Sequence, residues 1–417
     1  MVNARAPDVL EELFRAEWPV LVAAAARIVG DVGAAEELVQ DVLVAALARW
    51  PFTGVPDRPG AWLMTATRNR ARNRRRDDAR ARARLESAAV ISVEDAEPSR
   101  EPIDDDRLRL MFICAHPVLP AESQTALTLR LVAGLSTRAI ARGLMRPEAT
   151  VAQRIVRAKR LLADARVPFT VPAPDDWDTR LPTLLRVLYL IFTEGHTAAE
   201  GAQLAHPELC EEAIRLARLL ADLVPETAEA HALVALMEYQ ASRLATRVDV
   251  EGDLVVLADQ DRAGWDRHRI RAGDVALAAA RTAGPPGRLS LQAAIAAEHA
   301  HARTWEATDW GRIVALYDAL AEIDPSPIVA LNRGVAVAMA DGATAGLVLV
   351  DALVADGELA DLHLLWATRA DLLRRAGRPR DAIADYNRAL GLTVNAAERR
   401  YLAGRRDECA DHREAAP

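Results

Sequence analysis

The stretch STRAIARGLMRPEATVAQRIVR, residues 136–157, decides the class of fold in this chain of 417 residues. Ser136 is a favourable N-cap for a short helix, and Met145-Arg146-Pro147 forms the turn that follows it. A second helix then begins, with apolar residues at helical spacing on its inner face: Val151, Ile155, Ala158 and Leu162. Two short helices joined by a tight turn predict a helix-turn-helix motif, which places its second helix in the major groove of DNA.

The outer face of that second helix carries the side chains that would read DNA. With the inner face assigned, four polar residues point outward: Thr150, Gln153, Arg154 and Arg157. Hydroxyl, amide and guanidinium groups recognise base edges and phosphates. The alternative is a plain helical hairpin whose arginines are only solvated. We favour DNA binding, because the cap, the turn and the outward donors agree.

A second basic segment precedes this motif. Residues 66–84 hold nine Arg and two Asp, whereas the whole chain has a formal net charge of −8, so the remainder sums to −15. Lys159 is the only lysine. Asparagine is a poor helix former that reads base edges well, so Asn69 and Asn73 favour a nucleic-acid contact over a solvated run of charge. The candidate DNA-binding residues of this segment are Arg68, Asn69, Arg72, Asn73, Arg75 and Arg76.

Composition predicts an all-α fold in several domains. Hydrophobic residues make up 51% of the chain and aromatic residues only 4%, so the cores rest on Ala, Leu and Val, which favours helices. The length exceeds what one hydrophobic core usually supports. Changes in composition predict a helical bundle over 1–85, an acidic linker over 86–104, the helix-turn-helix domain over 105–166, a Pro-rich linker over 167–180 and a helical domain over 181–417.

The last of these domains contains repeat-like helix pairs. Large and small residues follow the tetratricopeptide template in the order Trp366, Ala370, Leu373, Gly377, Ala382, Tyr386 and Ala389. Gly334 stands 36 residues before Ala370, which is near the period of that repeat. Stacked helical hairpins bury faces that no single pair could cover. An ordinary Ala-rich helical domain is the alternative.

Several classes of protein are excluded by what the chain lacks. Its three cysteines lie far apart with no CxxC pair, which argues against a disulfide frame and structural zinc. No signal-peptide pattern and no apolar run of membrane-spanning length is present, so we expect a cytoplasmic protein. Glu194 and His196 form a candidate acid–base pair, but no nucleophile accompanies them. We therefore expect no enzyme activity, no catalytic residues, no cofactor and no metal.

Near the N-terminus, residues 32–50 predict an amphipathic helix capped by Asp31. Its two faces differ in character: Leu38, Val42 and Ala45 line the apolar face, and Glu36, Glu37, Gln40 and Asp41 line the polar face. The apolar face predicts packing within the bundle, which leaves the polar face to solvent or to a partner.

Three stretches of the chain resemble the extracytoplasmic-function sigma factors of bacterial RNA polymerase. They are Ala35-Glu36-Glu37-Leu38-Val39-Gln40-Asp41, then Pro59-Gly60-Ala61-Trp62-Leu63 running into Asn69-Arg70-Ala71, and Pro147-Glu148-Ala149-Thr150-Val151-Ala152-Gln153-Arg154. The C-terminal part resembles the subgroup with a tetratricopeptide-like extension, through Tyr189 to Gly195, Asp259 to Arg262 with Trp265-Asp266, and Ala330 to Arg333. The likeness spans nearly the whole chain.

The resemblance implies two partners, core RNA polymerase and promoter DNA. The first domain would be region 2, which binds the β′ clamp helices through Glu37, Gln40 and Asp41 and opens the −10 element with the Arg-rich helix. The helix-turn-helix domain would be region 4, which contacts the β flap and reads the −35 element. The acidic linker would run toward the polymerase active site. At two positions the chain departs from many relatives: Asn73 replaces Asp, and Ala152 replaces Lys.

The helical extension is expected to regulate these sigma domains in cis, without a separate anti-sigma factor, because a tether gives it a high effective concentration. Two other hypotheses remain open. One is a helix-turn-helix regulator whose repeat domain senses a ligand or a protein. The other is a scaffold whose basic helix binds no DNA. A conventional regulator needs no second nucleic-acid domain and no polymerase-binding face.

Overall fold

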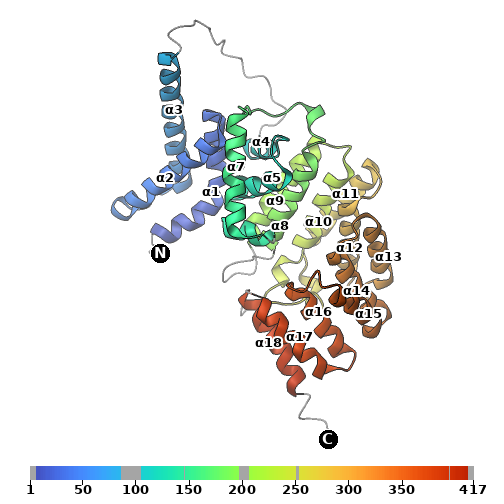
Figure 1. The fold of residues 1–417 in the computed structure, drawn as a ribbon. Helices are drawn as coiled ribbons and strands as arrows, with labels where there is room; N and C mark the ends of the chain where they lie inside the picture. The colour runs from blue at the N-terminus through green and yellow to red at the C-terminus, as the bar shows by residue number, and fades with distance from the viewer. Residues whose placement is uncertain are drawn as a thin grey trace. The chain divides into compact units, whose positions relative to one another are not determined.

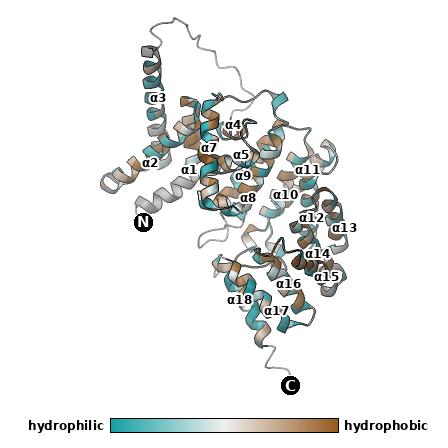
Figure 2. Cartoon of the chain, in the orientation of Figure 1, coloured by the Kyte–Doolittle hydropathy of each residue, from teal (hydrophilic) through white to brown (hydrophobic). Residues whose placement is uncertain are grey.

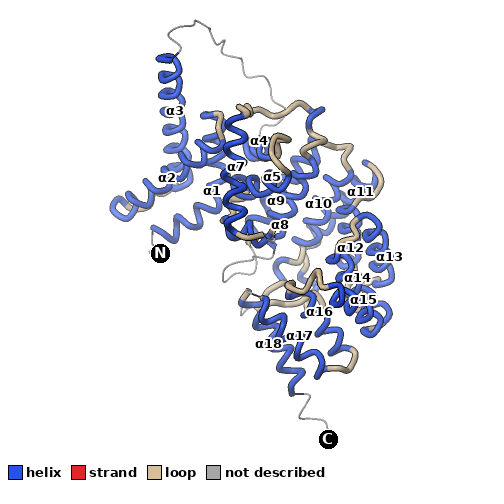
Figure 3. The backbone as a smooth tube through the Cα atoms, in the orientation of Figure 1, coloured by secondary structure: helices blue, strands red, loops and turns tan. Residues whose placement is uncertain are grey.

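The computed structural model describes residues 6–85, 105–144, 146–196, 206–249, 253–393 and 395–411. Within these ranges the chain forms helices joined by loops, and its one extended pairing is an antiparallel bridge between Val248 and Leu254 (Figures 1 and 3). The chain divides into two compact units, Met1–Ile191 and Phe192–Pro417. The prediction of an all-α fold is confirmed. The predicted acidic linker lies outside the described residues.

The first unit begins with a bundle of three helices, α1 (Ala6–Val29), α2 (Val32–Thr53) and α3 (Pro59–Leu85). Helix α1 packs against both others. Asp31 caps α2 as predicted, because its side chain accepts a hydrogen bond of 2.6 Å from the Ala34 N–H. The core of the bundle takes large apolar side chains from all three helices: Trp18, Leu21, Val39, Trp50 and Leu63.

The predicted faces of α2 are wrong at two positions. Ala45 is exposed, because the buried stripe of the helix follows Leu38, Val42 and Ala46 at a spacing of four and leaves Ala45 beyond its edge. Glu36 was assigned to the polar face, yet it is only 3% exposed. Glu36 is buried because two cationic side chains from later helices, Arg130 and Lys159, contact its carboxylate.

The rest of the first unit is built around the helix-turn-helix motif. Its helices are α4 (Asp106–Cys114), α5 (Ala121–Val132), α6 (Thr137–Gly143) and α7 (Glu148–Asp164). Ser136 caps α6 by accepting a hydrogen bond of 3.1 Å from the Ala139 N–H. Helix α7 packs on α5 and α6. The four residues predicted on its inner face are all buried, which confirms the motif: Val151, Ile155, Ala158 and Leu162.

Residues after α7 pack back onto α4 and α5. The ring of Trp177 lies 5.5 Å from that of Phe112, and Arg180 donates a hydrogen bond of 2.6 Å to the Phe112 carbonyl. Thr183 donates to the side-chain oxygen of Gln124 at 2.7 Å. The short helix η1 (Pro174–Asp176) and the first part of α8 (Leu181–His196) therefore complete the core of the first unit.

The second unit is a series of helices in which sequence neighbours pack in pairs, notably α10 with α11, α14 with α15 and α16 with α17. Its helices are α9 (Pro207–Leu223), α10 (Ala228–Ala241), η2 (Leu244–Thr246), η3 (Arg262–Gly264), α11 (Arg267–Ala283), α12 (Arg288–His301), α13 (Trp310–Ile323), α14 (Pro327–Asp341), α15 (Ala343–Asp356), α16 (His363–Arg375), α17 (Pro379–Leu392) and α18 (Ala396–Asp411).

Small residues bring the paired helices close together. A Cβ atom added to Gly346 of α15 would lie 2.6 Å from the carbonyl oxygen of Gly334 on α14, so only glycine fits there. Gly377 forms the turn between α16 and α17 with a φ of +74°, a value that favours glycine. The other template residues of this pair are buried, as predicted for paired helices: Trp366, Ala370, Leu373, Ala382, Tyr386 and Ala389.

Candidate nucleic-acid interface

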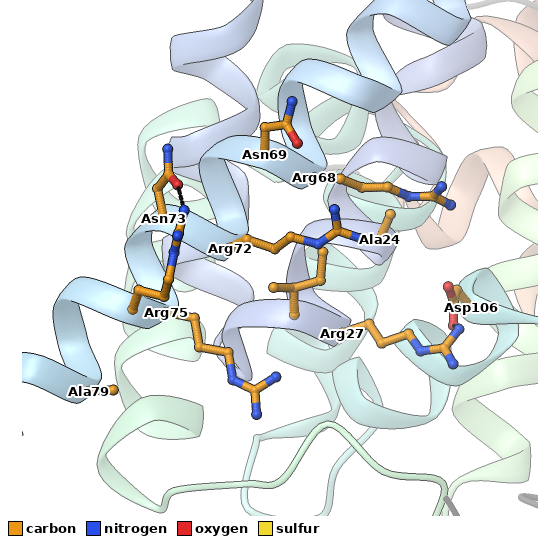
Figure 4. Close-up of a pocket in the computed structure, with 11 residues that line it drawn as sticks. Ala24, Arg27, Arg68, Asn69, Arg72, Asn73, Arg75, Ala79 and Asp106 are labelled. Carbon is orange, nitrogen blue, oxygen red and sulfur yellow. Dashed lines mark hydrogen bonds and ion pairs between the residues drawn. The ribbon is translucent and has the colours of Figure 1, made fainter.

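A positively charged cleft of about 1030 Å³ lies between α1 and α3 in the first unit (Figure 4). One acidic residue lines it, Asp106, which lies 3.5 Å from the guanidinium of Arg27. Because a single carboxylate faces several guanidinium groups, the cleft has a positive potential that suits a polyanion. The arginines that line it are Arg27, Arg68, Arg72, Arg75 and Arg76.

Helix α3 turns its arginines outward because a narrow apolar stripe holds it to the bundle. Leu63, Thr67 and Ala71 repeat at a spacing of four and are fully buried. The exposed pair between Arg70 and Asp41 of α2, at 2.8 Å, adds a polar link between the two helices. Apart from Ala71, residues 68–77 are exposed, and Figure 2 shows hydrophilic residues along this part of the helix.

The six predicted −10 residues are all exposed, and they occupy two faces of α3. Arg68, Arg72 and Arg75 share one face and extend toward the side where Arg27 lies (Figure 4). Asn69 and Asn73 lie on another face, where Asn73 accepts a hydrogen bond from Arg76. The first face presents charge suited to phosphates, and the second presents amide groups suited to base edges.

The predicted −35 residues lie on the outer side of α7. Gln153 and Arg157 are exposed and stand one turn apart, with the partly exposed Thr150 one turn before them. Arg154 is the exception, because it forms an ion pair with Glu122 of α5 and its side chain is only 24% exposed. Gln153 and Arg157 are therefore the side chains most available to a major groove.

The outer side of α2 combines polar and apolar groups. Glu37, Gln40 and Asp41 are exposed as predicted. Continuing along the helix, Val44 is 63% exposed and Phe52 is 89% exposed. Large apolar side chains in such exposed positions are typical of surfaces that bind proteins. Sequence reasoning missed them, although their hydrophobicity beside a polar face was a readable signal.

Glu36 connects α2 to the helix-turn-helix domain inside the first unit. Its carboxylate accepts hydrogen bonds from Arg130 of α5 at 3.1 Å and from Lys159 of α7 at 2.9 Å. The guanidinium of Arg130 also lies 5.3 Å from the ring of Trp18. The sequence analysis did not find this junction, because its members are 94 and 123 residues apart.

His196, one member of the candidate acid–base pair, is buried against Arg247 in the structure. His196 receives a hydrogen bond of 2.7 Å from Arg247, and burial strongly lowers the pKa of its ring, so it is neutral at neutral pH. The three cysteines are buried, and all are free thiols. Within the described ranges, no group of three or more His, Cys, Asp or Glu side chains is placed to hold a metal ion.

Comparisons with known families match both parts of the first unit and the beginning of the second. Residues 13–81 match Sigma-70 region 2, residues 109–162 match Sigma-70 region 4, and residues 180–281 match a family of unknown function, DUF6596. The chain belongs to the extracytoplasmic-function sigma factors and carries a C-terminal helical DUF6596 domain. Sigma factors are not enzymes; they bring core RNA polymerase to promoter DNA.

Relatives extend the likeness along most of the chain. Uncharacterized protein R00370 of Rhizobium meliloti (strain 1021) is 40% identical over 399 residues, which cover 94% of each chain. The probable ECF RNA polymerase sigma factor SigI of Mycobacterium tuberculosis, from two strains, is 28% identical over 197 residues, which cover 43% of this chain and 67% of SigI. No solved structure gives a significant match. Among the residues described, no helix is both long enough and apolar enough to cross a membrane.

Proposed function

We propose that this sigma factor reads the −10 element with α3 and the −35 element with α7, while α2 binds the β′ clamp helices of the polymerase. The observation that carries the proposal is the cleft lined by five arginines in the region 2 domain. In this assignment Arg68, Arg72 and Arg75 hold phosphates, and Asn69 and Asn73 contact bases. The factor acts in the cytoplasm with the core enzyme, and the region 4 domain contacts the β flap.

The −35 assignment rests on the exposed side of α7. Gln153 and Arg157 present an amide and a guanidinium one turn apart, a pattern that reads base edges in a major groove. Thr150 and Arg154 flank them, and Arg154 exchanges its contact with Glu122 for one with DNA. The rival hypothesis of a conventional helix-turn-helix regulator leaves the region 2 match and the charged cleft unexplained.

Run-off transcription with core RNA polymerase and genomic DNA fragments tests this function. The expected result is defined start sites that depend on the added factor. Arg72→Gln should reduce these transcripts about fivefold or more, because it removes a charge from the cleft. Arg80→Gln is the matched control, since Arg80 is an exposed arginine of the same helix outside the cleft. Absence of any defined start site would contradict the proposal.

We further propose that residues 181–417 regulate the sigma domains in cis, so that no separate anti-sigma factor is required. In support, the similar Rhizobium meliloti protein aligns over nearly all of both chains, so the extension accompanies the sigma domains there as well. The chain outside the Arg-rich segment carries a formal charge of −15. Negative charge in the extension would shield the arginines of that segment electrostatically.

Truncation after His196 tests the regulatory role. This cut follows the end of α8 and keeps the contacts of Arg180 and Thr183 inside the first unit. Promoter-specific transcription by the truncated factor is compared with that of the full chain over a range of salt concentrations. A gain indicates that the extension inhibits, and a loss indicates that it is required. Equal activity at every salt concentration would contradict regulation in cis.

A further inference from the structure

A pocket of about 230 Å³ lies among α11, α12 and α13 in the second unit (Figure 1). Helix α12 packs against both of the other helices. The floor of the pocket is apolar, and all its side chains except Ala294 are buried: Leu277, Ala280, Leu291, Ala294 and Leu316. Because alanine side chains end at Cβ, positions 280 and 294 leave space that larger side chains would fill. The pocket therefore offers a ligand an apolar surface that is already formed.

The mouth of this pocket is positively charged. Arg281, in the last turn of α11, and Arg312, in the first turn of α13, both line it and are both exposed. None of the described residues that line the pocket is acidic. Ser290 also lines it, but its hydroxyl already donates a hydrogen bond of 2.9 Å to Glu229 of α10. Two guanidinium groups at the mouth of an apolar pocket suit a ligand with an anionic head and an apolar body.

The connection between α11 and α12 forms a fixed wall of the pocket. It is the run Gly284-Pro285-Pro286-Gly287, whose first and third residues line the pocket. The proline rings fix two backbone φ angles, which limits how far this connection can move. After it, the carboxylate of Glu229 accepts hydrogen bonds from the backbone N–H groups of Leu289 at 2.8 Å and Ser290 at 3.0 Å. The wall is thus held in place before a ligand binds, so little ordering entropy opposes binding.

The carboxylates closest in sequence to the two arginines are engaged elsewhere. Asp274, the acidic residue of α11, accepts a hydrogen bond of 2.7 Å from the hydroxyl of Tyr239 and lies 3.0 Å from His301. Asp309 caps α13, where it accepts a hydrogen bond of 2.8 Å from the Arg312 N–H. Neither of these two carboxylates lines the pocket. The carboxylate of a ligand would thus meet guanidinium groups without an acidic competitor in the lining.

We propose that this pocket binds a carboxylate with an apolar chain of about eight carbons, with Arg281 and Arg312 holding the carboxylate and the floor contacting the chain. A methylene group is similar in size to a water molecule, which takes up about 30 Å³, so the pocket accommodates roughly eight carbon atoms. Inorganic phosphate would leave the floor in contact with water, and a neutral lipid would leave the guanidinium groups unused. The inference concerns the second unit alone and does not depend on the promoter assignments.

Isothermal titration calorimetry of the full chain with sodium octanoate tests the site. The expected result is one site per chain with a Kd below about 1 mM. Butyrate has about four fewer methylene groups, each contributing about fourfold in affinity when buried, so it should bind at least about thirtyfold more weakly. The alcohol 1-octanol keeps the chain but has no charge, and it should bind at least about fivefold more weakly.

Substitutions separate the head of the ligand from its chain. Arg281→Gln and Arg312→Gln should each weaken octanoate binding about fivefold or more and leave 1-octanol binding unchanged, because only the carboxylate contacts the guanidinium groups. Arg271→Gln is the matched control, since Arg271 is an exposed arginine of α11 outside the pocket. Ala294→Leu should weaken binding of both ligands, because the larger side chain fills the floor. If that variant fails to fold, the butyrate comparison tests the floor instead.

The proposal is overturned if octanoate does not bind, if butyrate or 1-octanol binds as tightly as octanoate, or if both pocket arginine variants behave like Arg271→Gln. Equal losses of octanoate and 1-octanol binding in the pocket arginine variants would contradict the contact with the carboxylate. A folded Ala294→Leu variant that binds octanoate as tightly as the parent chain would place the ligand elsewhere and overturn the proposal as well.

Discussion

At the scale of single residues, Glu36 has a structural role in the first unit that its place in the sequence does not indicate. Glu36 is almost fully buried, and a carboxylate in such a place needs charged partners, which Arg130 and Lys159 supply. Both cations are themselves less than a quarter exposed, so solvent screens the cluster only in part. Removing the carboxylate leaves two cations close together without their common counter-charge.

Glu36→Gln should therefore lower the free energy of unfolding of the first unit by about 2–4 kcal/mol. Urea unfolding of residues 1–196 measures the effect. Glu37→Gln is the matched control, because Glu37 neighbours Glu36 but is exposed, and it should change stability by no more than about 0.5 kcal/mol. Equal losses in the two variants would show that the buried cluster contributes nothing specific.

His299 should make the second unit sensitive to acid. Burial lowers its pKa to about 4 in the fold, against a value near 6.5 when unfolded, so between these values the unfolded chain binds a proton that the folded chain does not. Stability from this residue is therefore present above pH 6.5 and falls as the pH drops below it. We expect a loss of about 1–2 kcal/mol from pH 7 to pH 5, seen as a lower Tm. His299→Gln should remove that part of the pH dependence; an unchanged dependence would contradict the assignment.

At the scale of elements, α7 and α3 present different chemistry to nucleic acid. The exposed side of α7 offers a few separated polar groups, which suit specific base contacts. The cleft face of α3 concentrates guanidinium groups, which suit phosphates of any sequence. Substitutions in the two helices should therefore differ in how their effects depend on promoter sequence and on salt.

Gln153→Ala or Arg157→Ala should weaken use of the preferred −35 sequence by about 1–3 kcal/mol and relax discrimination among −35 variants. Arg75→Ala should weaken all promoters to a similar extent and reduce the salt slope by about 1. Arg160→Ala, an exposed change on α7 outside the predicted set, is the control. Binding of the reconstituted holoenzyme to a panel of promoter variants measures each effect. Indistinguishable profiles for all three test variants would remove the claim of base reading.

Local sequence patterns predicted the helices well, but they could not predict the side-chain contacts between helices that are distant in the sequence. The inner face of α7 followed from helical spacing, and Ser136 and Asp31 marked helix starts through ordinary capping chemistry. The burial of Glu36 could not be predicted in this way, because its partners come from two other helices.

At the scale of the whole molecule, the first unit does not end with the helix-turn-helix motif. Trp177 packs on Phe112, and Arg180 and Thr183 bond to groups on α4 and α5. Phe112 is fully buried, so a chain that stopped at the end of α7 would expose it. The segment that reads as a Pro-rich linker thus contributes to the core of the region 4 part.

Residues 1–196 should accordingly form a helical unit that unfolds cooperatively when produced alone. A fragment that ends at Arg166 lacks the contacts of Trp177 and Arg180, so its Tm should be lower by several degrees. Circular dichroism during heating compares the two fragments. Equal melting temperatures would show that residues 167–196 add no stability to the first unit.

Because Lys159 is the only lysine of the chain, its side chain can be modified selectively. Reagents and enzymes that modify amines find one side chain to attack, and that side chain holds Glu36 at the meeting point of α2, α5 and α7. Acetylation there would neutralise one of the two cations on a buried carboxylate. Apart from the N-terminal amine, an amine-reactive dye would likewise attach at one defined junction between the helix proposed to bind polymerase and the helix proposed to read the −35 element. A single acylation would thus place either a reporter or a perturbation at that contact, with no cysteine engineering.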